Sequence, residues 1–467
     1  MSPAPERSDG AAAIVGRGGA VTLIVVAFVL GIAVRAALLS IAPRWGFSGD
    51  HVDYVCWGRQ AVANGVLDLY RHPPGPCPAD LFIDGRATRL GAGSNERLNY
   101  PALSAYVFAL EGRLHRALDP EAVANTFTSR AVYAVSTTLA ELATALGIFV
   151  LVGSFATAGA AALAFAATWL APPLLIDGPF WGQTESWILA PAVWMLVAMT
   201  RGRWLAAGAL WGVALALKPS GLIVAPLWLY AFLFRPARTR IVLGGVLAVA
   251  VVNLLALPFW LDSGDAWLRA TFTENYVYRL QWTTAMAFNV WYADLLWTGV
   301  LDPRVPVLGI GRDAWGTLFL AVGLVAAFAL ARAWERRHVA LARFGLVPAS
   351  ALIMLAAVML PTRVHSTYGA FTAPFLVATA ALAPRATIGA AACFVTISLQ
   401  ILSWQWGNLL AMHVQADETV FPPALRARRQ ELRAIDRPRE WALTVANLAA
   451  ASAVAIGVGA SVRRPRA

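Results

Sequence analysis

The stretch "GAVTLIVVAFVLGIAVRAALLSIAPRWGFSGDHVDYVCWGRQ", residues 19–60, decides the class of fold. Its first part, 19–41, is a nearly continuous apolar run, and a helix needs about 20 such residues to cross a bilayer. The run is longer than the core of a signal peptide and lacks a small-residue cleavage site before the polar segment that follows. We therefore expect a retained membrane span. Two carboxylates, Asp50 and Asp53, follow it, where a membrane protein usually has a short turn.

The composition extends this interpretation to the whole chain. Of its 467 residues, 59% are hydrophobic and 13% are charged, and the mean hydropathy is +0.62. Soluble domains carry about 25% charged residues. We predict an all-α polytopic membrane protein with one domain over residues 1–467. About twelve helices are expected, and their apolar runs begin near residues 19, 130, 156, 186, 203, 219, 240, 314, 340, 367, 386 and 441.

The arginines gather at the ends of alternate apolar runs, and the formal net charge is +11. Binding of nucleic acid would need a basic face or tail, which this pattern lacks, so no nucleic-acid partner is expected. By the positive-inside rule, the arginine-rich side is cytoplasmic and holds both termini. The arginines on that side are Arg7, Arg17, Arg201, Arg203, Arg235, Arg238, Arg240, Arg332, Arg336, Arg337, Arg343, Arg385, Arg463, Arg464 and Arg466.

The long loops all fall on the opposite, outer side, at residues 42–129, 262–313 and 405–440. The first is expected to hold a helix over residues 50–64 and another after Tyr100. The second is rich in Trp, Tyr and Phe, as is typical of the bilayer interface, and it either guides a lipid chain or only anchors the fold. Cys56 and Cys77 share the first loop and would pair if it faces an oxidising compartment.

Four polar turns are expected on the outer side together with Asp50. They read "NYPALSAY" at 99–106, "IDGPFWGQTES" at 176–186, "LKPSG" at 217–221 and "TRVHSTYGAF" at 362–371. Hairpins between apolar helices need only turn residues, whereas ionisable groups at membrane depth are costly. We therefore predict one site, built with Asp50 from Tyr100, Asp177, Gln183, Glu185, Lys218, Arg363, His365 and Tyr368.

Several of these residues also have a simpler explanation that involves no functional site. Lys218 is the only lysine, and a compact ammonium suits a phosphate, but the residue is also compatible with chance retention in an interfacial turn. Asp50 can simply cap its helix. His365 can be an ordinary interfacial histidine, with Arg363 snorkelling beside it. Glu141, inside the second span, is either structural or part of the site.

Motifs for metals and phosphate loops are missing from the sequence. There is no metal-ligand spacing, Gly-rich phosphate loop or nucleophile elbow. Asp50 and Asp53 are compatible with a divalent cation, but nothing demands one. We expect that no cofactor is required, and no metal ligand is assigned.

The motifs resemble those of GT-C glycosyltransferases. "SGDHVDYVCW" and "NYPAL" are similar to the first outer-loop motif and the "DYPPL"-like stretch of the ER glucosyltransferases that use dolichyl-phosphate-glucose. "IDGPFWGQTES", "LALKPSGLIVAPL" and "RVHSTYGAF" are similar to turns of bacterial and GPI polyprenol-dependent mannosyltransferases. Two departures are Ser366, where a Glu often follows the histidine, and Asp53, where the ER enzymes have no firm acid.

The resemblance implies an inverting transfer of a hexose, mannose or glucose, from a polyprenyl-phosphate donor to a hydroxyl of a lipid or glycan acceptor. Such a transfer needs a carboxylate base and cations at the phosphate leaving group. Asp50 is then the base and Asp53 a supporting acid or acceptor contact. The phosphate side is Lys218, His365 and Arg363, with Arg279 as a weaker candidate, and the sugar or acceptor contacts are Tyr100, Asp177, Gln183 and Glu185, with Tyr368 also in the substrate-binding set.

A transporter or flippase of a lipid-linked saccharide is the alternative function, because carriers often have this number of helices. Carriers place charged groups near the bilayer midplane between repeated halves, whereas the polar residues here gather at one interface. An inert membrane scaffold is a third interpretation. The arginine-rich, lysine-poor composition favours the plasma (inner) membrane of a GC-rich bacterium, with membrane lipids around the chain and a periplasmic active site.

Overall fold

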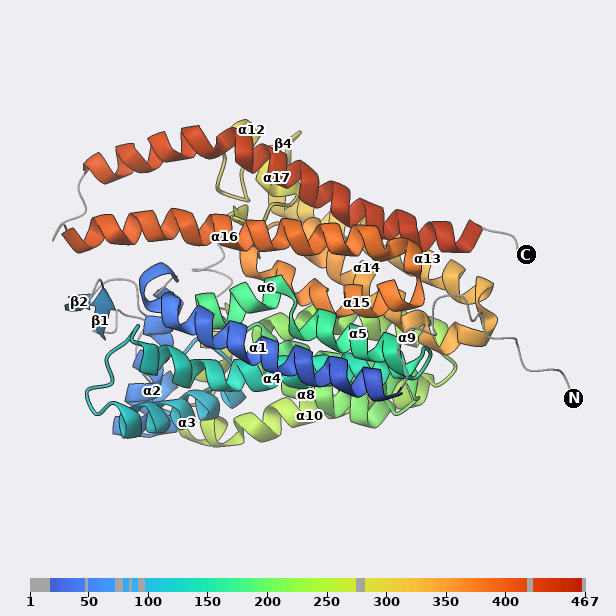
Figure 1. The fold of residues 1–467 in the computed structure, drawn as a ribbon, viewed down its shortest axis with the longest axis horizontal. Coiled ribbons are helices and arrows are strands. Elements are labelled where there is room, and N and C mark those ends of the chain that lie inside the picture. The colour runs from blue at the N-terminus through green and yellow to red at the C-terminus, as the bar shows by residue number, and fades with distance from the viewer. Residues whose placement is uncertain are drawn as a thin grey trace, which may run out of the picture.

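Helix α1 (Arg17–Trp45) is the first of a set of long helices that run side by side (Figure 1). The structure is a computed structural model that describes residues 17–46, 49–71, 79–83, 86–90, 97–273, 282–417 and 423–463. The start of α1 and the end of the last helix lie at the same end of the bundle (Figure 1). Cys77 and Arg279, both named from the sequence, lie outside the described residues.

The first half of the chain supplies the helices around Asp50. After α1 come α2 (Gly49–Asn64), η1 (Val66–Tyr70), β1 (Ala79–Ile83), β2 (Arg86–Leu90), α3 (Ala102–Leu118), α4 (Phe127–Gly153), α5 (Ala158–Trp169), α6 (Pro172–Leu175), η2 (Ile176–Trp181), α7 (Ser186–Thr200), α8 (Trp204–Leu217), η3 (Pro219–Val224), α9 (Ala225–Phe234) and α10 (Arg238–Ser263). Strands β1 and β2 pair antiparallel, with Ala79 opposite Leu90. The helices α2 and α3 confirm the two helices that the sequence predicted in the first long loop.

The second half adds the helices that close the other side of the bundle. They and the short strands are α11 (Ala266–Leu268), β3 (Thr284–Ala285), α12 (Val290–Thr298), β4 (Pro306–Val307), β5 (Ile310–Gly311), α13 (Arg312–Arg337), η5 (Val339–Gly345), α14 (Leu346–Met359), β6 (Val364–His365), η6 (Ser366–Thr372), α15 (Ala373–Leu382), η7 (Pro384–Ala386), α16 (Thr387–Asp417) and α17 (Pro423–Arg463). Strand β3 pairs parallel with β6, and β4 pairs antiparallel with β5.

The apolar runs of the sequence are helices of spanning length or close to it. Eight described segments are long and apolar enough to cross a membrane, and three shorter apolar helices accompany them, at Ser186–Thr200, Trp204–Leu217 and Pro219–Phe234. Their starts lie within a few residues of the predicted ones. This confirms the all-α polytopic fold class, whereas the expected number of about twelve spans is not confirmed.

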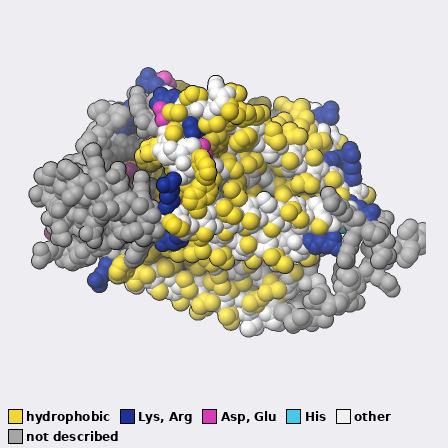
Figure 2. Space-filling view, turned by 90° about the horizontal axis from the view of Figure 1, so that it is seen from above, with side chains coloured by type: hydrophobic (Ala, Val, Ile, Leu, Met, Phe, Trp, Pro, Cys, Tyr) yellow, Lys and Arg dark blue, Asp and Glu magenta, His cyan; other side chains and the backbone are white. Residues whose placement is uncertain are grey.

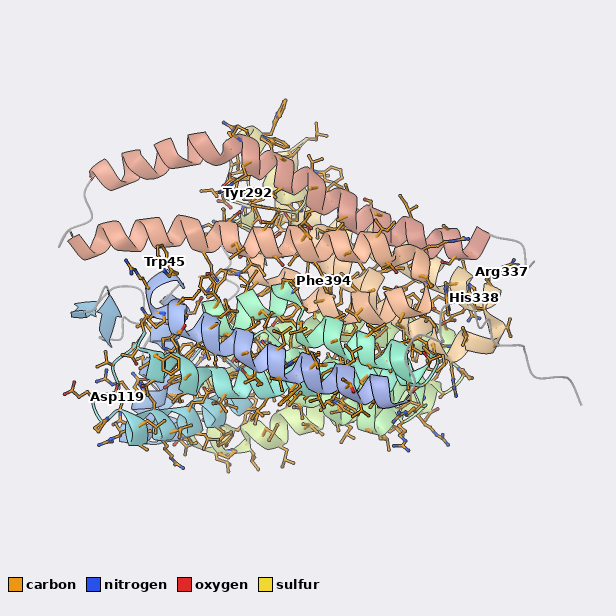
Figure 3. The ribbon with its side chains drawn as sticks, viewed as in Figure 1. Trp45, Asp119, Tyr292, Arg337, His338 and Phe394 are labelled. Atoms are coloured by element: carbon orange, nitrogen blue, oxygen red, sulfur yellow. The ribbon has the colours of Figure 1, made fainter. Side chains whose placement is uncertain are left out.

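Charged side chains lie mainly at the two ends of the bundle. Figure 2 shows a broad hydrophobic surface with basic groups toward its ends. Figure 3 places Arg337 and His338 at one end, called here the arginine end, and Trp45 and Asp119 at the other, which also carries α2 and is called the Asp50 end. At the arginine end, Glu335 is buried and accepts hydrogen bonds from Arg235 at 2.5 Å and Arg332 at 2.7 Å.

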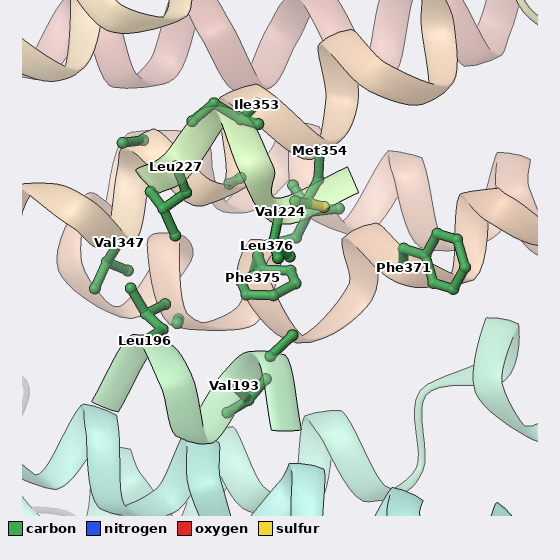
Figure 4. Close-up of a cluster of buried hydrophobic side chains, with 14 of the residues drawn as sticks. Val193, Leu196, Val224, Leu227, Val347, Ile353, Met354, Phe371, Phe375 and Leu376 are labelled. Atoms are coloured by element: carbon green, nitrogen blue, oxygen red, sulfur yellow. The ribbon is translucent and has the colours of Figure 1, made fainter. Parts of the chain in front are cut away.

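The largest apolar core packs α7, α14 and α15 against η3 and α9 (Figure 4). Val193 and Leu196 of α7 meet Val347 of α14 and Leu376 of α15, and none of these side chains is accessible. Inside a membrane, helices associate through such close packing because lipid is as apolar as the side chains. The core therefore fixes the spacing of the helices that begin and end at the polar turns of the Asp50 end.

Two segments predicted as loops differ from that expectation: one is mostly helical, and the other has buried aromatic residues. Residues 405–440 mostly continue as helix, in α16 as far as Asp417 and in α17 from Pro423. No proline interrupts residues 385–421, so nothing stops α16 where its apolar run ends. In the second long loop, Trp267 and Phe288 are buried inside the protein, while Trp297 is exposed.

Helices α8 and α10 cross at two glycines. A Cβ atom added to Gly208 would lie 2.0 Å from the backbone oxygen of Gly244, so the backbones can approach only because no side chain intervenes. Gly245, the next residue of α10, faces open space.

We predict that Gly208→Ala destabilises the protein by about 1–3 kcal/mol, because the added methyl group forces the two helices apart. Gly245→Ala is the matched control and leaves the unfolding midpoint unchanged or slightly raised. Thermal unfolding of both purified variants in one detergent measures the difference. Equal midpoints for the two variants would contradict the close crossing.

Candidate active site

The Asp50 carboxylate is oriented by two donors from the turn after η2. Trp181 Nε1 donates to Asp50 Oδ2 at 3.0 Å, and Gln183 Nε2 donates to the same oxygen at 2.6 Å. Among the described residues, Oδ1 accepts no hydrogen bond, and the residue is only half-buried. Asp50 lies in the first turn of α2, where the helix dipole favours a negative charge. The carboxylate is thus fixed through one oxygen and available through the other.

The turn that holds Asp50 has an unusual backbone. Element η2 is a π-helical turn, a conformation that is rare and frequent at functional sites. It ends at Gly182, which has φ of 91°, a left-handed conformation that glycine adopts without strain. Arg130 of α4 donates to the backbone oxygen of Trp181 at 2.6 Å. The side chains of Trp181 and Gln183 therefore face Asp50 from a backbone that is itself anchored.

Lys218 and Glu185 form a buried ion pair beside this turn. Lys218 Nζ contacts Glu185 Oε2, and their side chains are 7% and 1% exposed. Lys218 precedes Pro219, and a residue before proline is pushed out of the helical conformation, so α8 ends there and Lys218 is extended. Glu185 lies directly before α7. Burial has the largest single effect and disfavours the charge of Lys218, but Glu185, Tyr100 and Tyr368 together outweigh it and raise the pKa of Lys218 above its ordinary value.

His365 joins the cluster through Thr367. The Nδ1 atom of His365 lies 2.9 Å from Thr367 Oγ1, and that hydroxyl donates to Glu185 Oε1 at 2.8 Å. The ring of His365 also lies 5.8 Å from the ring of Trp181. Burial lowers the pKa of His365, although the nearby Asp50 and Glu185 act in the opposite direction, so the imidazole is neutral at pH 7.

Hydroxyl groups complete the cluster on the side of α2. The hydroxyl of Tyr54 lies 3.2 Å from that of Tyr100 and 3.3 Å from Gln183 Oε1. Lys218 Nζ stands 5.2 Å from the centre of the Tyr100 ring, a cation–π distance. Polar groups from α2, η2 and η6, and from the residues next to the ends of α3, α7 and α8, therefore meet at the Asp50 end of the bundle.

Asp177 is the most enclosed acid of the cluster. It is 0% exposed, and neither carboxylate oxygen has a hydrogen-bond partner among the described residues. It lies within electrostatic range of Glu185 and Lys218. In the part of the chain that the structure describes, no group of three or more His, Cys, Asp or Glu side chains is arranged to hold a metal ion.

An apolar pocket lies between the helices that continue from these turns. It is lined by Ile188 and Leu189 of α7, Gly221 and Val224 of η3, and Phe371 of η6, with further apolar residues around them. Each of these positions follows Glu185, Lys218 or His365 by a few residues. The pocket is small, with room for about one water molecule, and it belongs to the apolar core of the bundle.

The structure brings most of the predicted residues together but not all of them. Tyr368 contacts the cluster through its ring, 6.1 Å from that of His365. Asp53 is buried on α2, and Arg363 pairs with Asp313 at 3.8 Å. The residues that the structure groups around Asp50 are Tyr100, Asp177, Gln183, Glu185, Lys218, His365 and Tyr368.

Three contact residues were not predicted from the sequence. Trp181 and Tyr54 belong to quoted motifs, but an aromatic side chain in a membrane protein gives no signal of its own that it binds a carboxylate. Thr367 follows His365 by two residues in a turn, where threonine is common.

The cysteines named from the sequence differ in state: Cys56 is disulfide-bonded and Cys393 is free.

Comparison with known proteins gives two distant structural similarities. No family model and no curated protein matches the chain. Two solved structures are similar over 95% of it at 13% sequence identity: apo ArnT from Cupriavidus metallidurans, with a TM-score of 0.44 over 78% of that chain, and the Archaeoglobus fulgidus oligosaccharyltransferase tethered to an acceptor peptide, with a TM-score of 0.39 over 55% of that chain. With TM-scores below 0.5, the likeness assigns no role to any residue.

We predict that Lys218→Met alone destabilises the protein by about 3–5 kcal/mol, because it leaves the Glu185 carboxylate buried without its cation. The double variant Lys218→Met/Glu185→Gln should recover most of this loss, since both charges are then removed. Thermal unfolding in one detergent compares the single and double variants. Equal destabilisation in both would contradict the buried pair.

A second prediction concerns pH and rests on His51, whose Nε2 lies 3.0 Å from Ser129 Oγ. Burial, with Arg130 and His115 nearby, lowers the pKa of His51 well below its ordinary value. Below about pH 6.5 the unfolded chain binds a proton at this residue that the folded chain does not, so stability falls as the pH drops.

The expected effect of His51 is about 1.4 kcal/mol for each pH unit below that value. His51→Gln removes the titrating group, so the variant should lose less stability than the wild type between about pH 7.5 and 5.0. Unfolding midpoints at both pH values measure the two losses. Parallel losses in the two proteins would refute the prediction.

Proposed function

We propose that this chain is an inverting glycosyltransferase that moves a hexose from a polyprenyl-phosphate-linked donor to a hydroxyl group of a lipid or glycan acceptor. The observation that carries the proposal is the Asp50 carboxylate, held through Oδ2 by Trp181 and Gln183, with Oδ1 available. A general base needs a fixed direction and access to the proton that it removes. Asp50 has both.

The rest of the cluster fits the two partners of such a transfer. Lys218, the only lysine of the chain, supplies a positive charge where the phosphate leaving group develops negative charge. Its present partner, Glu185, keeps that charge stable inside the bundle until a phosphate is bound. The neutral His365 and the hydroxyls of Tyr54 and Tyr100 are donors suited to sugar and phosphate oxygens.

In the proposed reaction, the Asp50 carboxylate removes the proton of the acceptor hydroxyl while its oxygen attacks the anomeric carbon of the donor sugar. The bond between that carbon and the phosphate oxygen breaks, and the polyprenyl phosphate leaves with the electron pair next to Lys218. Because attack and departure occur on opposite faces of the sugar, the anomeric configuration inverts.

The proposed orientation follows from the charges. The arginine end would face the cytoplasm by the positive-inside rule, and the Asp50 end would face outward. The plasma membrane of a GC-rich bacterium, with a periplasmic site, is the proposed setting. Mannose and glucose are the proposed sugars.

We predict that purified protein with membrane lipids as acceptors transfers label from polyprenyl-phosphate-mannose or from polyprenyl-phosphate-glucose, tested in separate tubes. Asp50→Asn should lower the rate by about a hundredfold to ten-thousandfold, because an amide cannot take the proton. Asp265→Asn, at an exposed position, is the matched control and should keep the wild-type rate.

The same preparation in proteoliposomes separates transfer from transport. Movement of the labelled lipid across the bilayer without a new glycosidic product would support a flippase instead. Wild-type transfer by the Asp50→Asn variant would remove Asp50 from the role of base.

A further inference from the structure

Arg35 of α1 and Glu141 of α4 form an ion pair inside the membrane-spanning part of the bundle. Arg35 Nη2 lies 2.6 Å from Glu141 Oε2, and the side chains are 3% and 0% exposed. Arg35 also donates to the backbone oxygens of Gly31 and Trp169 at 3.1 and 3.0 Å, and its guanidinium stacks 3.5 Å above the Trp169 ring. The guanidinium therefore has one fixed position, and it fixes the carboxylate.

The second oxygen of Glu141 faces the turn that holds Asp50. Ser186, the first residue of α7, donates to Glu141 Oε1 at 3.0 Å. A Cβ atom added to Gly178 of η2 would lie 2.4 Å from the same Oε1. Glycine at 178 is thus required for the turn to rest on the carboxylate, and the carboxylate limits how far the turn can move.

Backbone hydrogen bonds within the turn connect the Glu141–Gly178 contact to the two residues that donate to Asp50. The N–H of Gly182 donates to the oxygen of Gly178 at 2.6 Å, and the N–H of Gln183 donates to the oxygen of Asp177 at 2.9 Å. These bonds couple the part of the turn that rests on Glu141 to the part that carries Trp181 and Gln183. A shift at Gly178 is therefore passed to the two donors of Asp50.

Stability alone does not explain why the pair is charged. Replacing a buried ion pair by apolar side chains of similar volume is often neutral or stabilising. An ionised pair in a span is costly by comparison, and it usually marks function. What an apolar pair cannot supply is an oxygen of fixed position that at once accepts from Ser186 and supports Gly178.

We propose that Arg35 and Glu141 are positioning residues for Asp50, which act through the turn at 176–183. Neither residue touches Asp50, and neither is assigned a contact with substrate. The proposal rests on the proposed function, because the quantity that the pair controls is the orientation of the Asp50 carboxylate during transfer.

The test uses four variants of the full-length chain: Gly178→Ala, the neutral double variant Arg35→Met/Glu141→Ala, the triple variant that combines them, and Gly245→Ala as a glycine control with open space around it. Each is compared with the wild type for kcat and KM with the active donor, for binding of undecaprenyl phosphate, and for the thermal unfolding midpoint. The neutral double variant avoids an unpaired buried charge, so a folded protein is expected.

The positioning role predicts a kcat of the double variant that is lower by roughly tenfold to a hundredfold, as expected for a small misplacement of a reacting group. KM for the donor, undecaprenyl-phosphate binding and the unfolding midpoint should stay close to the wild type. Gly178→Ala should lower kcat in the wild-type background and have little further effect in the double variant, where the carboxylate is gone. Gly245→Ala should change nothing.

A double variant with wild-type kcat would overturn the proposal, as would a fall in kcat that merely follows loss of folded protein. If the wild type transfers from no donor, the proposed function fails and the positioning of a base fails with it. In that case the unfolding midpoints still test the contact between Glu141 and Gly178. Gly178→Ala must then destabilise the wild type more than it destabilises the double variant. Equal effects would show that Glu141 does not support the turn.

Discussion

Charge pairing in a water-poor interior is the constraint on which the Asp50 end depends. An unpaired cation there would be costly, and the buried cations Lys218 and Arg35 each contact a carboxylate. Glu185 and Ser186, consecutive residues at the start of α7, serve two such pairs: Glu185 contacts Lys218, and Ser186 donates to Glu141. The start of α7 therefore connects charged residues of α1 and α4 with Lys218, which follows α8.

The turn at 176–183, which contains η2, is held between these pairs. Glu141 supports it at Gly178, and Arg130 binds the backbone oxygen of Trp181. A loop of this length would otherwise adopt many conformations, and ordering each residue costs about 1–2 kcal/mol of backbone entropy. Because the supports come from helices of the bundle, the order of the turn does not depend on a bound ligand. This agrees with a site built in advance on rigid elements.

The sequence predicted the fold well where local chemistry decides the structure. Apolar length placed the starts of the helices, and Pro219 explains why Lys218 ends α8. Local chemistry was misleading for residues 423–440, whose polar composition suggested a loop although Ala, Leu, Arg and Glu are good helix formers. Contacts such as that of Arg363 with Asp313, or of Thr367 with Glu185, depend on helix packing, and no single segment contains that information.

The pairing of β3 with β6 has a mechanical consequence. Thr284 and Ala285 lie opposite Val364 and His365, and the backbone N–H of Arg363 donates to the oxygen of Thr283 at 2.9 Å. This miniature ladder joins two connections that are about eighty residues apart in the chain. The backbone at His365 therefore cannot move alone: residues 283–285 must move with it, or the pairing must first break. Either way, a backbone movement at His365 is coupled to a distant connection of the chain.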